Sequence, residues 1–346
     1  MLRAVVQTFK GNRSTLSTPG RDLLNWPGDP VATAALRDRI DSARALIGPH
    51  IHRTPLVTSR RLSEAAGRPI LLKLENLQKT GSFKVRGFLH KVLRHCASNS
   101  NGLLTFSSGN AAQGLAYAAQ RCGRRAVVVM TPGANPAKVT ATRAYGAEIV
   151  FAESLASIAA TAADICEREG LTQIHPYDDE DLMIGHASLG LELLEDMPGD
   201  ATVVSALGGG GMAGALGLVA TACAAPRGIV VVEPTGAIQF HAALQEGRPV
   251  PVAGSTIAEG LCPPIVGRHC FEVIRHTMSE HLLVSDEEIR HAMCALLESA
   301  KTLAEPSGAV ALAAALCGRI TTGGSGPLVV IVSGGNIDLQ RLKTLL

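Results

Sequence analysis

From about Pro30 onward, short apolar runs rich in β-branched residues alternate with alanine-rich stretches of helical period. A chain with this alternation folds into strands joined by crossover helices, because helices must cover the faces of a parallel sheet. The runs are apolar on both faces, as expected for strands covered by helices. The sequence therefore predicts an α/β protein with mainly parallel sheets.

Gly, Pro or Asn follows most of the predicted strands within a few residues. The strands are Ile70–Leu74, Leu103–Phe106, Ala126–Met130, Glu148–Phe151, Thr202–Ala206, Ile229–Val232, Leu282–Val284 and Leu328–Val332. Several predicted helices open with a good cap or a proline, as at Asn135-Pro136 and Ser285-Asp286-Glu287-Glu288. The helices include Val31–Ile47, Lys84–Arg94, Ala111–Arg121, Pro136–Tyr145, Ser157–Glu169, Asp181–Glu195, Met212–Cys223, Asp286–Ser299 and Gly308–Cys317.

The length of 346 residues, 46% of them hydrophobic, is enough for a large core and suggests two domains. The net charge is only +2, and no basic stripe is interleaved with the few aromatic residues, so we expect no nucleic-acid partner. The longest uncharged stretch, Ala201 to Pro226, contains four consecutive glycines and many alanines, which makes it a poor membrane span. We therefore expect no membrane partner either.

The eight cysteines are scattered singly, without the spacing of a zinc site, and are interpreted as reduced, mostly buried thiols in a cytoplasmic protein. The first thirty residues carry four basic residues before the first acid, Asp22. This composition fits a flexible N-terminal extension, and it is also compatible with an organellar transit segment.

Four consecutive glycines, Gly208 to Gly211, follow a predicted strand and open a helix of small residues. Backbone N–H groups at such a turn, together with the positive end of the helix dipole, form a binding site for a phosphate. The run lacks the Lys-Ser/Thr ending of a P-loop, so the glycines alone do not identify the phosphate compound.

Lys84 lies in the segment Thr80-Gly81-Ser82-Phe83-Lys84-Val85-Arg86-Gly87. Ser82 is predicted to cap a helix and to place Lys84 in its first turn, where the dipole disfavours the cation. A lysine with a lowered pKa supplies the neutral amine that attacks a carbonyl to form a Schiff base.

Two further loops are polar and follow buried strands. Ser107–Gly114 precedes a helix, and its hydroxyls, amide and free N–H groups suit a carboxylate. Ser333–Asn336 follows the strand Leu328–Val332, at the end of a parallel sheet where ligands bind.

Six segments in register closely resemble the fold-type II pyridoxal-phosphate enzymes, in the branch of threonine/serine dehydratases and serine racemases. They are Arg53–Leu56, Lys73–Gly87, Ser107–Gly114, Gly208–Gly211, Glu305–Ala309 and Ser333–Asn336. The resemblance implies a fold like the tryptophan synthase β subunit, with two open twisted, mainly parallel sheets. It implies a small lobe, residues 102–175, inserted into a large lobe formed by residues 31–101 and 176–346, after a flexible extension of residues 1–30.

The same resemblance implies that pyridoxal 5'-phosphate is the cofactor and that Lys84 holds it as a Schiff base and moves the substrate's Cα proton. Ser333 would bond the pyridine nitrogen and Asn110 the phenolic oxygen of the cofactor. The implied cofactor-binding residues are Lys84, Phe83, Asn110, Gly208, Gly209, Gly210, Gly211, Met212, Glu305 and Ser333. The implied substrate-binding residues are Ser107, Ser108, Gly109, Asn110, Ala111 and His186.

The implied activity is that of a dehydratase, or ammonia-lyase, which converts a 3-hydroxy amino acid such as threonine or serine into a 2-oxo acid and ammonia. Racemisation is the main competing activity, because Ser108 stands where serine racemases carry their second catalytic residue. The resemblance also leaves open a dehydratase for a larger 3-hydroxy amino acid, as in hydroxyectoine breakdown, cysteine synthase-like β-replacement, and a regulator that has lost catalysis. Relatives form homodimers or homotetramers, and the same is expected here.

The chain departs from the family pattern on the substrate side. Ala111 replaces the usual histidine, and Gly185-His186-Ala187-Ser188 replaces the usual Gly-Gln-Gly-Thr segment. The acidic pair of a divalent-cation site becomes Ile238-Gln239, which leaves only Glu233 and the Ala237 carbonyl, so we predict no metal.

Overall fold

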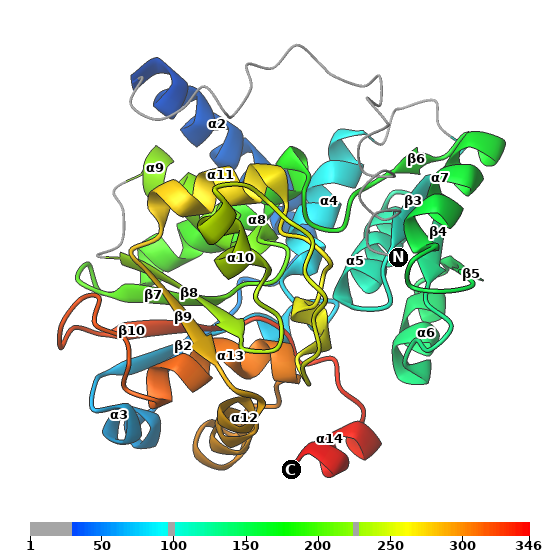
Figure 1. Cartoon of the computed structure of the whole chain (residues 1–346). Helices are drawn as coiled ribbons and strands as arrows, with labels where there is room; N and C mark the ends of the chain where they lie inside the picture. Colours follow the sequence, from blue (N-terminus) through cyan, green and yellow to red (C-terminus); the bar gives the residue numbers. More distant parts are fainter. Residues whose placement is uncertain (1–29, 96–100, 224–227) are drawn as a thin grey trace.

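The computed structural model describes residues 30–95, 101–223 and 228–346. Residues 1–29 of the predicted extension and Cys96 lie outside the described residues. The described strands form two separate sheets, which stand side by side with α4 (Lys84–Arg94) and α5 (Asn110–Arg121) between them (Figure 1). Two mainly parallel sheets with flanking helices confirm the predicted fold class.

The large sheet has the strand order β1-β2-β10-β7-β8-β9. All neighbours pair in parallel except β1 with β2. The strands are β1 (Leu56–Thr58), β2 (Ile70–Leu74), β7 (Thr202–Ala206), β8 (Gly228–Pro234), β9 (Glu280–Val284) and β10 (Leu328–Val332).

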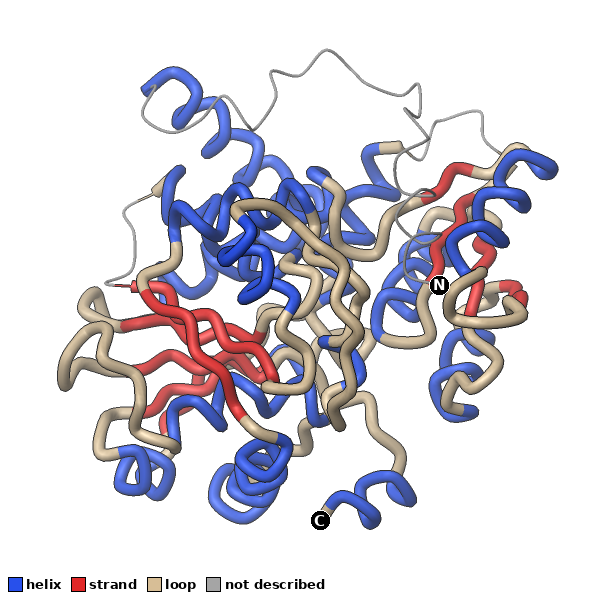
Figure 2. Tube along the Cα trace, in the orientation of Figure 1, coloured by secondary structure: helices blue, strands red, loops and turns tan. Residues whose placement is uncertain are grey.

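Helices cover both faces of the large sheet, as the tube in Figure 2 shows. Successive residues of a strand point to opposite faces, so Val203 and Val204 of β7 lie in two different cores. This double burial explains why the central strands are mostly apolar on both faces, with Thr202 and Ser205 of β7 as buried polar exceptions. One face is covered by α2 (Pro30–Ile47), α8 (Glu180–Asp196), α9 (Gly211–Ala222), α10 (Gln239–Glu246) and α11 (Arg268–Thr277), the other by α3 (Arg60–Ala66), α12 (Asp286–Ala300) and α13 (Pro306–Leu316).

The small sheet is parallel throughout, in the order β5-β4-β3-β6. Its strands are β3 (Leu103–Phe106), β4 (Ala126–Met130), β5 (Glu148–Phe151) and β6 (Thr172–Gln173). α7 (Ile158–Glu169) packs on one face, and α4, α5 and α6 (Pro136–Ala144) pack on the other. These strands all lie within the segment predicted to form the small lobe, and the lobe boundaries at residues 102 and 175 stay a prediction.

Most predicted elements begin and end within one or two residues of their observed bounds. Both predicted caps named above are present: Asn135 accepts from the Ala137 N–H, and Ser285 forms a capping box with Glu288. The expectation of strands buried on both faces is wrong for β5, an edge strand with Glu148 and Phe151 exposed. The predicted elements do not include the short strands β1 and β6 or the helices α3, α10, α11 and α14 (Leu339–Leu345). A strand of two or three residues is too short to show an alternating pattern.

The seven described cysteines form no disulfide with one another. Of these seven described cysteines only Cys270 is buried, so the expectation of mostly buried thiols is wrong. Within residues 30–95, 101–223 and 228–346, no helix combines the length and apolar character needed to cross a membrane.

Candidate active site

Three of the predicted site segments meet at one end of the large sheet. β2, β10 and β7 are parallel neighbours, so the loops that follow them emerge at the same edge. Direct backbone contacts join two of these loops: the Phe83 N–H donates to the Ser333 carbonyl (3.2 Å), and Ser82 pairs with Gly334 in a β-bridge. The topology therefore brings Lys84, Ser333 and the glycine loop (Gly208–Gly211) to one place.

Lys84 is the first residue of α4, as predicted, but Ser82 does not cap the helix. The N-cap residue is Phe83, which makes no side-chain capping bond. Ser82 is used instead in the bridge to Gly334, and its buried hydroxyl has no partner among the described residues. The predicted cap is wrong because the β-bridge holds Ser82 one residue too far from the helix start.

The Lys84 ammonium group donates to the Pro176 carbonyl at 2.9 Å and lies 5.2 Å from the centre of the Phe83 ring. Burial lowers the pKa of Lys84 to about 8, because the charged form loses hydration that one carbonyl does not replace. Near pH 7 roughly a tenth of the amine is therefore neutral, far more than for a lysine with an ordinary pKa. The sequence predicted a lowered pKa from the helix dipole, whereas burial is the largest cause.

The glycine loop joins β7 to α9. At Gly209 a Cβ atom would lie 2.4 Å from Cδ2 of the Tyr177 ring, and Gly210 has a φ of 96° that L side chains rarely adopt. None of the amide N–H groups from Gly208 to Met212 donates a hydrogen bond to another described residue. Together with the helix dipole of α9, these groups are arranged as anion donors, and the phosphate that the sequence places there stays a prediction.

Asn110, the first residue of α5, links the small sheet to the large one. Its amide group donates to Glu305, and its side-chain carbonyl accepts from Asn336 at 2.8 Å. Lys138 contacts the other Glu305 oxygen at 3.3 Å. The predicted cofactor residues Asn110 and Glu305 therefore form one network, which orients the Asn110 amide.

Ser333 is buried at the end of β10, where its hydroxyl donates to the Ser307 carbonyl at 3.3 Å. In the loop after β3, Ser107 accepts from the Gly109 N–H, and Ser108 accepts from the Thr131 N–H at 3.0 Å. The N–H groups of Asn110 and Ala111 have no acceptor among the described residues. This start of α5 therefore offers N–H donors to an anion, and the substrate carboxylate expected there stays a prediction.

His186 lies in α8 and is buried. Its Nδ1 accepts from the Gly87 N–H at 3.0 Å, so the ring is neutral with its proton on Nε2, and Nε2 has no partner among the described residues. Burial, followed by the charges of Lys84 and Arg86, lowers the pKa of His186 well below its usual value. The ring also packs edge-on against Phe83, with centroids 4.8 Å apart. His186 thus supports the start of α4, and its substrate contact stays a prediction.

Arg86 lies at the centre of a buried ion network that the sequence did not reveal. It forms paired hydrogen bonds with Glu75, at 2.8 Å each, and donates to Glu192 at 2.7 Å. Lys73 donates to Glu192 at 2.6 Å and to the Thr54 carbonyl at 2.8 Å. Burial lowers the pKa of Arg86, but the adjacent carboxylates outweigh it and raise the pKa overall. The network ties α4 to β2 and α8.

Pro176 and Tyr177, which also lie at the site, were missed by the sequence analysis. They follow β6 and reach Lys84 and the glycine loop only through the tertiary fold. The sequence has no local signal for them, since neither belongs to a motif that resembles the family.

The carboxylate oxygens of Glu233 are already engaged by protein groups. The carboxylate accepts from the backbone N–H groups of Phe240 (2.7 Å) and His241 (2.9 Å) and contacts His281 Nε2 at 2.9 Å. Within the described part of the chain, no group of three or more His, Cys, Asp and Glu side chains could hold a metal ion.

A family model described as "Pyridoxal-phosphate dependent enzyme" matches residues 47–334. The chain belongs to this family. An L-threonine ammonia-lyase of Geobacter sulfurreducens is 38% identical over 298 residues, which cover 85% of this chain and 74% of that protein. The match confirms the resemblance drawn from the six motifs.

Solved structures of a serine racemase and of a threonine deaminase are both similar to this one. A maize serine racemase has a TM-score of 0.83 and 33% identity and covers 89% of this chain and 95% of that chain. A threonine deaminase from T.th. has a TM-score of 0.78 and 37% identity and covers 87% of this chain and 98% of that chain. Overall similarity therefore does not separate the two activities.

The cofactor of this family fits the residues that the structure brings together. A phosphate needs N–H donors, and those of the glycine loop and Met212 have no described acceptor. An aldehyde needs a neutral amine, and the lowered pKa of Lys84 supplies it. The Ser82 hydroxyl, beside Gly334, is buried and has no hydrogen-bond partner among the described residues. A bound ligand could provide that partner.

Proposed function

We propose that this chain is a pyridoxal-phosphate-dependent ammonia-lyase that acts on a small 3-hydroxy amino acid, threonine or serine. The observation that carries the proposal is the position of the Lys84 amine, which donates to the Pro176 carbonyl next to Tyr177, the residue that packs against the glycine loop. The ammonia-lyase from Geobacter sulfurreducens and the threonine deaminase structure support the same reaction. The net reaction converts the amino acid into a 2-oxo acid and ammonia.

Pyridoxal phosphate, when bound, withdraws electrons from the substrate's α-carbon and so acidifies the proton there. In our proposal the Lys84 amine attaches the resting cofactor and then, as a neutral base, takes the Cα proton. The N–H groups of the glycine loop and Met212 hold the phosphate. The N–H groups of Asn110 and Ala111 hold the substrate carboxylate, which orients the Cα–H bond toward Lys84. The β-hydroxyl would leave as water with the proton that Lys84 took from Cα, and water would hydrolyse the released enamine to the 2-oxo acid and ammonia.

Serine racemisation is the second candidate, and Ser108 is the observation that favours it. Racemisation needs a second acid/base group that can return the proton to the opposite face of the α-carbon. The Ser108 hydroxyl accepts from the Thr131 N–H and also contacts the Thr131 hydroxyl at 3.0 Å. This pairing fixes the orientation of the Ser108 hydroxyl.

One assay separates these candidates. Purified protein reconstituted with pyridoxal phosphate is supplied with L-threonine, L-serine or D-serine, and both 2-oxo acid and enantiomer ratio are measured. We expect 2-oxo acid release from the L-amino acids, lost in Lys84→Ala and unchanged in the exposed Lys343→Ala. Interconversion of D- and L-serine that exceeds oxo-acid release, and that disappears in Ser108→Ala, would identify a racemase. Turnover of none of the three amino acids by a protein that retains the cofactor would overturn both proposals.

We further propose that the enzyme works in the cytoplasm as a homo-oligomer. Seven cysteines without a mutual disulfide suit a reducing compartment. Leu77 and Leu303 are both exposed and together line one surface cavity of about 850 Å³, and apolar side chains that gather on a surface mark interaction sites. Light scattering on the purified protein tests the oligomer, and a mass of 36.0 kDa would contradict it.

A further inference from the structure

The segment His175–Asp178, between β6 and α8, contacts both halves of the proposed cofactor site. The sequence analysis assigned it no function, and His175 belongs to none of the six segments that carry the family resemblance. The Pro176 carbonyl accepts from the Lys84 amine at 2.9 Å. Proline has a fixed φ and no N–H, so this carbonyl sits on a stiff part of the backbone.

Tyr177 supports the glycine loop from the other side. Its ring is so close to Gly209 that a Cβ atom there would lie 2.4 Å from two ring carbons. Its backbone carbonyl lies 3.3 Å from the position of a Cβ at Gly211, and its hydroxyl donates to the Ile265 carbonyl at 3.0 Å. The buried ring is therefore held at both ends against the loop.

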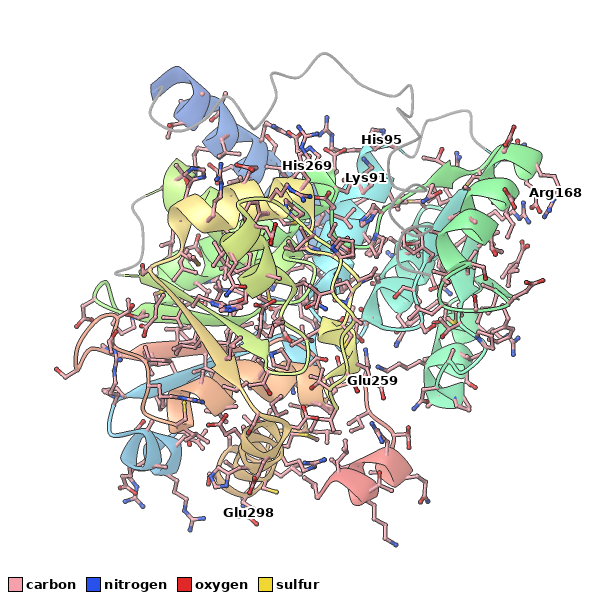
Figure 3. All side chains as sticks on the ribbon, viewed as in Figure 1. Lys91, His95, Arg168, Glu259, His269 and Glu298 are labelled. Carbon is pink, nitrogen blue, oxygen red and sulfur yellow. The ribbon has the colours of Figure 1, made fainter. Side chains whose placement is uncertain are left out.

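Asp178 connects the segment to α11, where His269 is labelled in Figure 3. Its carboxylate accepts from the backbone N–H groups of Arg268 (2.9 Å) and His269 (3.0 Å). The Gly267 N–H, just before this helix, donates to the Gly209 carbonyl at 3.0 Å. Asp178 thus holds the glycine loop through a second route.

His175 fixes the turn itself. Its Nδ1 accepts from the backbone N–H groups of Tyr177 (3.4 Å) and Asp178 (2.9 Å). Its ring packs edge-on against Phe106, the last residue of β3, with centroids 5.6 Å apart. The segment is therefore connected to the loop Ser107–Ala111 as well.

We propose that His175–Asp178 is a positioning element that holds the Lys84 amine and the glycine loop at a fixed separation, with Tyr177 as its central residue. This inference rests on the proposed function, because it takes Lys84 and the glycine loop as the two anchors of one cofactor. A ligand bound at both ends has a fixed length, so a shift of either anchor weakens the other. One stiff segment that contacts both anchors prevents such a shift.

The test is a double-mutant cycle on Tyr177 and Gly209. Gly209→Ala places a Cβ against the ring, and Tyr177→Ala removes the ring. Each single variant is expected to weaken pyridoxal-phosphate binding by about tenfold or more, measured by equilibrium dialysis of the cofactor against apoprotein. In the double variant the new Cβ occupies space that the ring has vacated. It should therefore bind the cofactor more tightly than the product of the two single effects predicts.

A second measurement separates positioning from simple support of the fold. The fraction of protein that carries cofactor on Lys84 after borohydride reduction is determined by mass spectrometry, below the melting temperature of every variant. Tyr117→Ala is the matched control, because Tyr117 also donates its hydroxyl to a backbone carbonyl, that of His50 (3.0 Å). It should lower the melting temperature but leave the attached fraction unchanged.

The outcomes distinguish the two levels of the proposal. If the wild-type chain retains no cofactor on Lys84, both the proposed function and this inference are overturned. If the wild type retains it but the two variants act independently, or only the melting temperature changes, the inference alone is wrong. Tyr177→Phe refines the result: it keeps the ring against Gly209, so we expect binding much closer to wild type than in Tyr177→Ala.

Discussion

Two lysines eleven residues apart in the sequence lie in opposite surroundings. Lys73 is fully buried and donates to the Glu192 carboxylate and to a backbone carbonyl. Lys84 is partly buried and donates to one carbonyl, and burial lowers its pKa to about 8. Both ammonium groups lose hydration on burial, but Lys73 contacts a carboxylate whereas Lys84 contacts a backbone carbonyl. The comparison shows that contact with a carboxylate, more than the depth of burial, distinguishes a structural lysine from a reactive one.

The largest expected effect comes from removing each amine in turn. Lys73→Met should lower the free energy of unfolding of the apoprotein by about 3–5 kcal/mol, because it breaks a buried ion pair and leaves Glu192 with one fewer cation. Lys84→Met should change it by no more than about 1 kcal/mol, since it removes only a single hydrogen bond from a poorly solvated amine. Urea unfolding of the two variants measures the difference.

Arg341→Ala is the control for this pair, because its partner Glu259 is exposed and the two groups lie 3.1 Å apart at the surface. Its loss should cost no more than about 1 kcal/mol. Equal destabilisation by the two lysine variants would contradict the distinction between them.

The next effect in size concerns His175. As for Lys84, burial disfavours the charged form of its side chain. Burial lowers the pKa of His175 from 6.5 to about 4. Between these values the unfolded chain binds a proton that the folded chain does not, so the free energy of unfolding decreases as the pH falls from about 6.5 to about 4. The decrease from this residue is at most about 3 kcal/mol. Protonation of Nδ1 would also break the two backbone hydrogen bonds that it accepts.

The measurement is urea unfolding between pH 4 and 6.5 for the wild type and for His175→Gln, which cannot take up the proton. The variant should lose less stability than the wild type over this range. Parallel curves would show that His175 is not the group that is kept neutral.

The smallest effect is kinetic and concerns Lys84 itself. Only the neutral amine attacks an aldehyde, so the rate at which apoprotein binds pyridoxal phosphate covalently should rise about tenfold per pH unit and level off above about pH 8. Free Nα-acetyllysine, with an ordinary side-chain pKa, should show a rise that continues to about pH 10. Stopped-flow absorbance follows both reactions. A protein profile that matches the free amine would mean that burial does not tune Lys84.

Several site residues could be predicted because their signals are local. Lys84 begins a helix, the four glycines lie between a strand and a helix, and Ser333 follows a buried strand; each position depends on a few neighbouring residues. The six motifs then indicated the family, which the family model confirms. The predicted Ser82 cap was wrong because the position of Ser82 depends on a distant residue. Gly334, 252 positions away, pairs with the backbone of Ser82 in a β-bridge.

The sequence by itself determined the layered α/β fold, the places of the main strands and helices, the family and its cofactor. The hydrophobic period and the turn residues are properties of short stretches, and the order of the motifs is read along the chain. All three can be recognised without knowledge of distant contacts. Only the tertiary structure decided which charges are compensated and what holds the anchors in place: Arg86 between Glu75 and Glu192, Lys84 against Pro176, and Tyr177 beneath Gly209. These pairings join residues up to about a hundred positions apart, and burial and electrostatics depend on distance in space, not on distance along the chain.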